Sequence, residues 1–149
     1  MSKTIVTGGA GFIGCNYVHR LLSRGDEVIV YDNLSRHGAE ANVSWLREEH
    51  GDDAFRLVVS DVRNAEALLQ AVGGVDVVVH LAGQTAVTTS VRDPRSDFQD
   101  NALGTFNVLE AARRTKESPI ILYASTNKVY GGMEHAKVVE EETRYRYED

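Results

Sequence analysis

Cysteine is nearly absent from this sequence, since Cys15 is the single one among 149 residues. A lone cysteine cannot form an internal disulfide, and we interpret Cys15 as a small residue packed in the first turn of a helix, not as a nucleophile. Long apolar runs are missing too, because no stretch approaches the roughly 20 residues that cross a bilayer. Met1-Ser2-Lys3 leads directly into an apolar segment. We therefore expect no signal peptide and a location in the cytoplasm.

An excess of basic residues is also lacking. Lysine and arginine number 16 against 22 aspartates and glutamates, which gives a net charge of −6. An acidic balance argues against nucleic acids and anionic membranes as main partners. The sequence shows neither internal repeats nor low-complexity tracts, and its length suffices for one domain with a core, which we assign to residues 1–149.

What the sequence does contain is a glycine-rich turn, TGGAGFIG at Thr7–Gly14, directly after the apolar run Thr4–Val6. Apolar residues then recur at helical spacing, so the pattern predicts a strand, a tight turn and a helix. Glycine permits the turn and lets phosphates and the helix approach closely. The start of the helix offers free N–H groups and a positive dipole to an anion. We expect this unit to bind the pyrophosphate of a dinucleotide.

A carboxylate strengthens this interpretation. Asp32 ends a second predicted strand, Glu27–Asp32. At that place an acid accepts hydrogen bonds from both hydroxyls of an adenosine ribose. It also repels a 2′-phosphate, which favours NAD over NADP.

Strands and helices alternate along the whole chain, which predicts an α/β fold with a parallel, doubly wound sheet of the Rossmann type. Ligands of such sheets lie at the carboxyl ends of the strands. The expected strands are Lys3–Thr7, Glu27–Asp32, Phe55–Val59, Asp76–Leu81 and Pro119–Ala124. The expected helices are Phe12–Arg24, Asn42–His50, Asn64–Val72 and a long one from Asp93 to about Arg114, with irregular chain after Gly132.

The ends of the third and fourth strands carry further candidates. Asp61 accepts the adenine amino group while Val62 packs the ring, or Asp61 satisfies backbone N–H groups at the start of the next helix; both interpretations stay open. His80 lies in an otherwise apolar strand. We interpret it as a core histidine with satisfied hydrogen bonds.

Small and polar residues follow the fourth and fifth strands. Ala82 and Gly83 permit close approach of a cofactor, and Asn101, which interrupts the long helix, is expected to bond backbone near it. Gly104 permits close packing there. A hydroxyl cluster at Ser125-Thr126 follows the fifth strand, at the expected nicotinamide end.

Together these motifs resemble the extended short-chain dehydrogenase/reductase family of NAD-dependent nucleotide-sugar epimerases and dehydratases. The resemblance covers essentially the whole chain and rests on TGGAGFIG, Asp32-Asn33-Leu34, Asp61-Val62-Arg63, His80–Gly83, Asn101–Thr105 and Val129-Tyr130-Gly131. Within the family, Ala82–Ser90, Ser125–Gly131 and Glu142–Tyr145 look like the CDP-paratose (CDP-tyvelose) 2-epimerases.

The resemblance implies a sheet order of 3-2-1-4-5 and a tightly held NAD that takes hydride from a sugar carbon and returns it to the opposite face. Thr126 matches the Ser/Thr of the catalytic set and would bond the reacting hydroxyl. The expected substrate-binding residues are Gln84, Thr126 and Asn127. The expected NAD-binding residues are Gly8, Gly11, Phe12, Ile13, Gly14, Asp32, Asn33, Ser35, Arg36, Asp61, Val62, Leu81, Ala82, Gly83, Gln84, Asn101 and Ser125.

The family's Tyr-x-x-x-Lys pair is not found, since no tyrosine in the sequence has a lysine four residues later. The resemblance places this pair, further strands and the sugar-binding region after a point that matches Asp149. We therefore expect the amino-terminal part of a larger enzyme, inactive by itself, with an exposed edge at the fifth strand.

Three functions compete: a CDP-sugar 2-epimerase or close relative, a nucleotide-sugar 4,6-dehydratase, and a non-catalytic NAD-binding protein. The dehydratases would need an Asp-Glu pair after Thr126, where this chain has Asn127-Lys128. The resemblance also implies a homodimer through helices around residues 86–113. One face there carries Phe98, Ala102, Phe106, Leu109 and Ala112, which would otherwise be buried against their own sheet.

Overall fold

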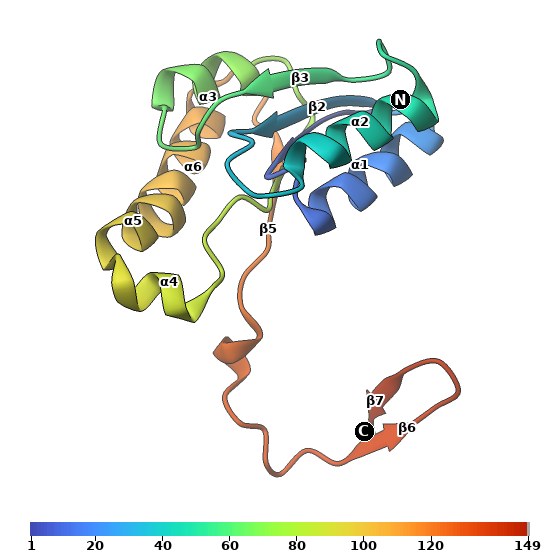
Figure 1. Ribbon diagram of the computed structural model, residues 1–149, viewed down its shortest axis with the longest axis vertical. Coiled ribbons are helices and arrows are strands. Elements are labelled where there is room, and N and C mark those ends of the chain that lie inside the picture. The colour runs from blue at the N-terminus through green and yellow to red at the C-terminus, as the bar shows by residue number, and fades with distance from the viewer. Residues whose placement is uncertain (149) are drawn as a thin grey trace.

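Five parallel strands form the central sheet of the molecule, in the order β3-β2-β1-β4-β5 (Figure 1). The computed structural model describes residues 1–148, the side chain of Asn127 excepted. The strands are β1 (Lys3–Thr7), β2 (Glu27–Asp32), β3 (Arg56–Val59), β4 (Val77–His80) and β5 (Ile120–Tyr123). This order confirms the predicted Rossmann-type fold.

Helices cover both faces of the sheet. Helices α1 (Phe12–Ser23) and α2 (Ala39–His50) lie on one face, and α3 (Ala65–Val72) and α6 (Gly104–Arg114) lie on the other (Figure 1). Successive strand residues point to opposite faces, so Val78 packs in the core under α3 and α6 while Val79 packs in the core under α1 and α2. The two-sided burial predicted for the fourth strand is confirmed.

The long helix is built in pieces. Helix α5 (Pro94–Phe98) begins as predicted, because Oδ1 of Asp93 accepts from the Ser96 N–H at 3.0 Å and Pro94 follows. A π-helical turn, η1 (Gln99–Leu103), then joins it to α6. Asn101 therefore lies where the regular helix is interrupted, as expected.

Three elements differ from the expectations drawn from the residue pattern. Helix α2 begins at Ala39 instead of Asn42. Helix α4 (Val87–Arg92) lies where the residue pattern showed only a polar stretch, because its two valines face outward and leave no buried stripe; the family resemblance places a helix there. A hairpin of β6 (Val138–Glu140) and β7 (Tyr145–Tyr147) forms in the carboxy-terminal region.

Strand β5 lies at the edge of the sheet and pairs with β4 alone among the described residues. Its side chains Ile120 and Leu122 are 65% and 49% exposed. The predicted exposed edge is confirmed. Beyond β5 the chain continues through a short 3-10 turn, η2 (Asn127–Tyr130), and the hairpin lies apart from the layered body (Figure 1).

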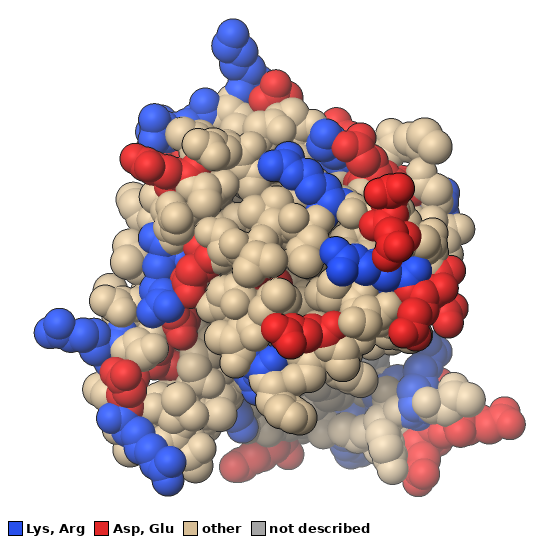
Figure 2. Space-filling view, turned by 45° about the horizontal axis from the view of Figure 1, so that its top comes forward, with Lys and Arg blue, Asp and Glu red and all other residues tan. Residues whose placement is uncertain are grey.

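Charges of both signs are interspersed on the face shown in Figure 2, without a broad basic patch. None of the helices in residues 1–148 has the length and apolar content needed to cross a membrane.

Candidate functional site

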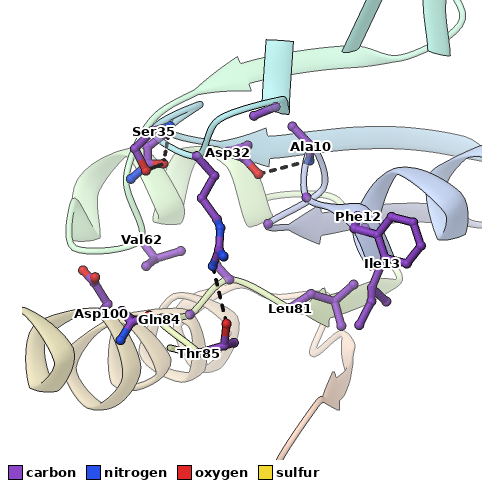
Figure 3. Close-up of a pocket in the computed structure, with 18 of the residues that line it drawn as sticks. Ala10, Phe12, Ile13, Asp32, Ser35, Val62, Leu81, Gln84, Thr85 and Asp100 are labelled. Carbon is purple, nitrogen blue, oxygen red and sulfur yellow. Dashed lines mark hydrogen bonds between the residues drawn. The ribbon is translucent and has the colours of Figure 1, made fainter. Parts of the chain in front are cut away.

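A groove of about 840 Å³ lies at the carboxyl ends of the strands. In Figure 3, Ala10 and Asp32 lie on one side of it, and Leu81, Gln84 and Thr85 lie on the other. The groove brings together every residue expected to bind NAD except Asp61 and Asn101, which lie outside its lining. Strand ends far apart in the sequence meet here because the sheet is parallel and its order reverses at β1.

The glycine turn forms the start of the groove. Gly8 has a φ of +70° and donates its N–H to the Tyr31 carbonyl at 2.8 Å. A Cβ on Gly8 would lie 2.7 Å from the Ala82 nitrogen, and one on Gly14 would collide with the Gly8 carbonyl oxygen. Gly11 precedes α1, and no side chain caps the helix. The first N–H groups of α1 are thus left for an anion.

Asp32 is fixed by backbone donors. Its Oδ2 accepts from the Ala10 N–H at 3.0 Å (Figure 3), and its Oδ1 accepts from the Leu34 N–H at 2.8 Å. Asn42 of α2 donates to the Ala10 carbonyl at 2.8 Å. The carboxylate and the glycine turn therefore hold each other in place at one wall of the groove.

Two polar side chains meet across the opening. Arg36, in the loop after β2, donates from Nη1 to Oγ1 of Thr85 at 3.4 Å (Figure 3). Ser35, beside it, donates to Oδ1 of Asn33 at 2.7 Å. All three residues predicted in this loop, Asn33, Ser35 and Arg36, line the groove.

Asp61 makes the backbone bond of its second proposed role, while adenine binding stays a prediction. Its Oδ1 accepts from the backbone N–H of Arg63 at 2.9 Å, and its carboxylate also pairs with the Arg63 guanidinium and the Asn33 amide. The bonds from Arg63 hold the pKa of Asp61 at about 2. Val62 lines the groove, whereas Asp61 does not. A Cβ on Gly104 would lie only 2.7 Å from Cγ2 of Val62, so glycine permits the predicted close packing.

His80 is a buried core histidine, as predicted. Its Nδ1 lies 2.6 Å from Oγ1 of Thr7, and its Nε2 lies 3.0 Å from Oγ1 of Thr105. Thr105 donates its own proton to the Asn101 carbonyl at 2.6 Å, so it accepts from Nε2–H, and Nδ1 accepts from Thr7. Burial lowers the pKa of His80 to about 4. Cys15 is also buried, and burial raises the pKa of its thiol, which disfavours the nucleophilic thiolate.

Asn101 bonds backbone, as predicted, although it does not line the groove. Its Oδ1 accepts from the Gln84 N–H at 2.8 Å and its Nδ2 donates to the Gln84 carbonyl at 3.0 Å. The side-chain amide of Gln84 is engaged within its own loop, where Oε1 accepts from the Ala86 N–H at 2.7 Å.

The residues after β5 are only partly brought to the groove. Ser125 lines it, but Thr126 does not. Thr126 is exposed, and its Oγ1 accepts from the Lys128 N–H at 3.2 Å at the start of η2. The predicted substrate contact of Asn127 concerns a side chain outside the described part of the chain.

Some lining residues were missed. Ser60 follows β3. The rule that ligands lie at the carboxyl ends of the strands, which selected Asp61, therefore also pointed to Ser60. His37, Asn42, Thr89 and Asp100 come from loops and helix starts that carry no such local signal.

Comparisons with known proteins agree with this geometry. A family model described as GDP-mannose 4,6 dehydratase matches residues 5–147. CDP-paratose 2-epimerase from Salmonella typhi is 45% identical over 145 residues, which cover 96% of this chain and 42% of that protein. A dTDP-glucose 4,6-dehydratase from Mycobacterium tuberculosis is 37% identical, covering 89% of this chain and 38% of that protein. The chain thus spans about two fifths of these relatives.

Solved structures give the same result. UDP-glucose-4-epimerase from Stenotrophomonas maltophila, with bound NAD, superposes with a TM-score of 0.80 at 26% identity, over 91% of this chain and 40% of that one. The Thermus thermophilus UDP-glucose 4-epimerase, in complex with NAD, is 40% identical with a TM-score of 0.63, over 74% and 33%. With its sheet order, its glycine turn and a family model that matches nearly its whole length, this chain belongs to the nucleotide-sugar epimerase and dehydratase family of the extended short-chain dehydrogenases/reductases.

Proposed function

We propose that the groove binds NAD. The observation that carries the proposal is the glycine turn, whose uncapped helix start and absent side chains leave a cradle for a pyrophosphate. Asp32 would bind the adenosine ribose, and Val62 would pack against the adenine. Leu81, Ala82 and Gly83 would line the path toward Ser125, at the nicotinamide end. Two solved relatives with bound NAD support the choice of cofactor.

NAD is proposed in preference to NADP because of Asp32. Its two oxygens are already tied to backbone N–H groups, which fix the negative charge at the groove wall. A 2′-phosphate placed on the same ribose would face that charge at short range.

The activity we propose for the complete site is epimerisation of a nucleotide sugar, with a CDP-sugar as the substrate class. The 45% identity to CDP-paratose 2-epimerase over nearly the whole chain supports it. Bound NAD would supply the redox chemistry, which is acceptance of a hydride from a sugar carbon and its return to the opposite face. By the family resemblance, Thr126 would bond the reacting hydroxyl, and Gln84 and Asn127 would contact the sugar; of the three, Gln84 lines the groove.

For the 149 residues taken alone, we propose NAD binding without epimerisation. The sequence has no tyrosine followed at four residues by lysine, the pair to which the family resemblance assigns the base and its activator. The same chain would then behave as a non-catalytic NAD-binding protein.

Dehydration is the second candidate. The description of the family model and the 37% identity to a dTDP-glucose 4,6-dehydratase favour it. The residues after Thr126 count against it, because Asn127-Lys128 stands where an Asp-Glu pair is expected.

We also propose a homodimer through the outer face of α4, α5 and α6. Phe98 and Phe106 are 65% and 60% exposed there, and Leu109 is also exposed. Ala112 does not belong to this face, because it is buried in the core between α6 and the sheet. Exposed aromatic rings are enriched at protein–protein contacts.

Calorimetric titration of the chain with NAD and with NADP tests the cofactor proposal. We expect binding of NAD, at least tenfold weaker binding of NADP, and loss of this preference in Asp32→Asn. Asp53→Asn, an exposed carboxylate in the loop before β3, is the control and should keep it. Absence of NAD binding to the folded chain would refute the proposal.

A turnover assay tests the rest. The 149-residue chain is incubated with CDP-paratose and NAD, and the sugar is followed by NMR. We expect the sugar to stay unchanged. Appearance of the 2-epimer would show that the chain carries a catalytic base that we have not identified.

A further inference from the structure

Four half-buried polar side chains form a cluster beneath the groove, which we call the Asp97 cluster: Gln84, Ser90, Asp97 and Asn101. A single oxygen of Asp97, Oδ1, receives all of its donors. Ser90 Oγ donates to it at 2.6 Å, Asn101 Nδ2 at 3.2 Å and Gln84 Nε2 at 3.4 Å. The cluster joins the loop after β4 to helices α4 and α5 and the π-helical turn η1.

Asp97 and the neighbouring backbone together orient both amides, since Gln84 Nε2 also donates to the Ala86 carbonyl at 2.8 Å and to Ser90 Oγ at 3.0 Å. An ionised carboxylate accepts hydrogen bonds and cannot donate them, so the NH₂ groups of Asn101 and Gln84 must face Asp97. Oδ1 of Asn101 is then free to accept from the Gln84 N–H, and Oε1 of Gln84 to accept from the Ala86 N–H. With either amide reversed, a carbonyl oxygen would face a carboxylate and a backbone N–H would face an NH₂ group.

These amides hold the loop on the side of the groove opposite Ala10 and Asp32. Asn101 bonds both the N–H and the carbonyl of Gln84. It also lies so close that a Cβ on Gly83 would be 2.7 Å from its Oδ1. Gly83 and Gln84 both line the groove. Any change in the Asn101 amide therefore changes the peptide planes that face the groove.

We infer that Asp97 is a positioning residue that fixes the loop Leu81–Gln84 for cofactor binding by orienting the amides of Asn101 and Gln84. The cofactor half of this inference rests on the proposed NAD site. The effect of Asp97 on the loop does not rest on that site, because hydrogen exchange of the Gln84 N–H can be measured without any ligand.

The test compares Asp97→Leu, which removes the accepting oxygen, with Asp97→Asn, which keeps one. Hydrogen exchange of the Gln84 amide is measured by NMR, and the dissociation constant of NAD by calorimetry. In Asp97→Leu we expect exchange at Gln84 to rise and NAD affinity to fall, each by about tenfold, as for the loss of hydrogen bonds to a charged group. Asp97→Asn should restore both to within about threefold of wild type.

Glu110→Gln is the control, because it removes a carboxylate from the exposed side of α6 and should change neither quantity. Thermal unfolding checks that each variant is folded. Should Asp97→Leu not fold, Asp97→Ala supplies the same test, because it also removes the accepting oxygen and adds no apolar bulk, so exchange should again rise.

Unchanged exchange at Gln84 in folded Asp97→Leu would overturn the inference, and so would an Asp97→Asn variant as impaired as Asp97→Leu. Raised exchange with unchanged NAD affinity would overturn the link to the groove. If the wild-type chain binds no NAD, the proposed function fails, and exchange at Gln84 alone decides whether Asp97 positions the loop.

Discussion

At the scale of single residues, His80 shows how neighbours determine chemistry. Thr7 and Thr105 bond its two ring nitrogens, and the ring is 2% exposed. The ring therefore stays neutral in the folded chain at a pH where an exposed histidine is charged. Its pKa of about 4 lies below the ordinary value of 6.5.

The folded chain should therefore lose stability as the pH falls through this interval. Between pH 6.5 and 4 the unfolded chain binds a proton at residue 80 that the folded chain does not, so the free energy of unfolding decreases by about 3 kcal/mol on this account. Urea unfolding at pH 7 and pH 4 of wild type and His80→Asn measures it. The variant should lose that much less than wild type on acidification.

His135→Asn is the control for this comparison, because His135 is exposed beyond η2 and its replacement should leave the pH dependence as in wild type. Equal losses in wild type and His80→Asn would contradict the assignment.

The rule that ligands lie at the carboxyl ends of parallel strands pointed to the glycine turn and Asp32, which line the groove, and also to Asp61, which does not. The glycine turn and Asp32 lie at one groove because their strands are parallel neighbours, which the alternation of elements already implied. Thr126 was placed by motif and not by geometry, and it lies outside the groove. The role of Asp97 had no signal, because it depends on side chains that only the folded chain brings together.

At the scale of elements, α6 is held by a polar bond as well as by its apolar face. Asn107 is buried and donates from Nδ2 to the carbonyls of Val62 and Arg63, at 3.0 and 3.2 Å. One turn earlier, Gly104 lets the helix approach Val62. The helix thereby fixes the segment after β3 that lines the groove.

Asn107→Leu should destabilise the chain by about 2 kcal/mol, because it keeps the volume but leaves the buried carbonyl of Val62 and the partly buried one of Arg63 without their donor. Urea unfolding gives the value. Arg114→Gln, exposed at the end of the same helix, should stay within about 0.5 kcal/mol of wild type. A loss in Asn107→Leu no larger than in this control would mean that packing alone holds α6.

The same scale explains which elements the sequence revealed. The five strands were predicted to within one or two residues, since each is an apolar run between turn residues and helices. The residue pattern did not reveal helix α4, which the family resemblance alone indicated, or the hairpin of β6 and β7, because they have no buried face: Val87, Val91 and Tyr145 are all largely exposed. Periodicity reports burial, so exposed elements escape it.

At the scale of the whole molecule, the outer face of α4, α5 and α6 determines the expected assembly. Phe106→Glu should raise the dissociation constant of the homodimer at least a hundredfold, because it places a charge in an apolar contact. Light scattering across a dilution series measures the mass. Val59→Glu, equally exposed at the far edge of the sheet, should leave the mass unchanged. A wild-type chain that is monomeric at all concentrations would refute the proposed dimer.

The central place of β1 has a consequence for synthesis. Thr7 pairs with Tyr31 of β2 on one side and with His80 of β4 on the other. The second pairing spans 73 residues. While the chain leaves the ribosome, the strands β3, β2 and β1 can associate early, but one edge of β1 keeps unpaired backbone N–H and C=O groups until β4 has emerged. Long-range parallel pairing is slow, and an open edge invites association with other chains. β1 is thus the first strand to be made, but its open edge is covered against association with other chains only when translation has produced residues 77–80.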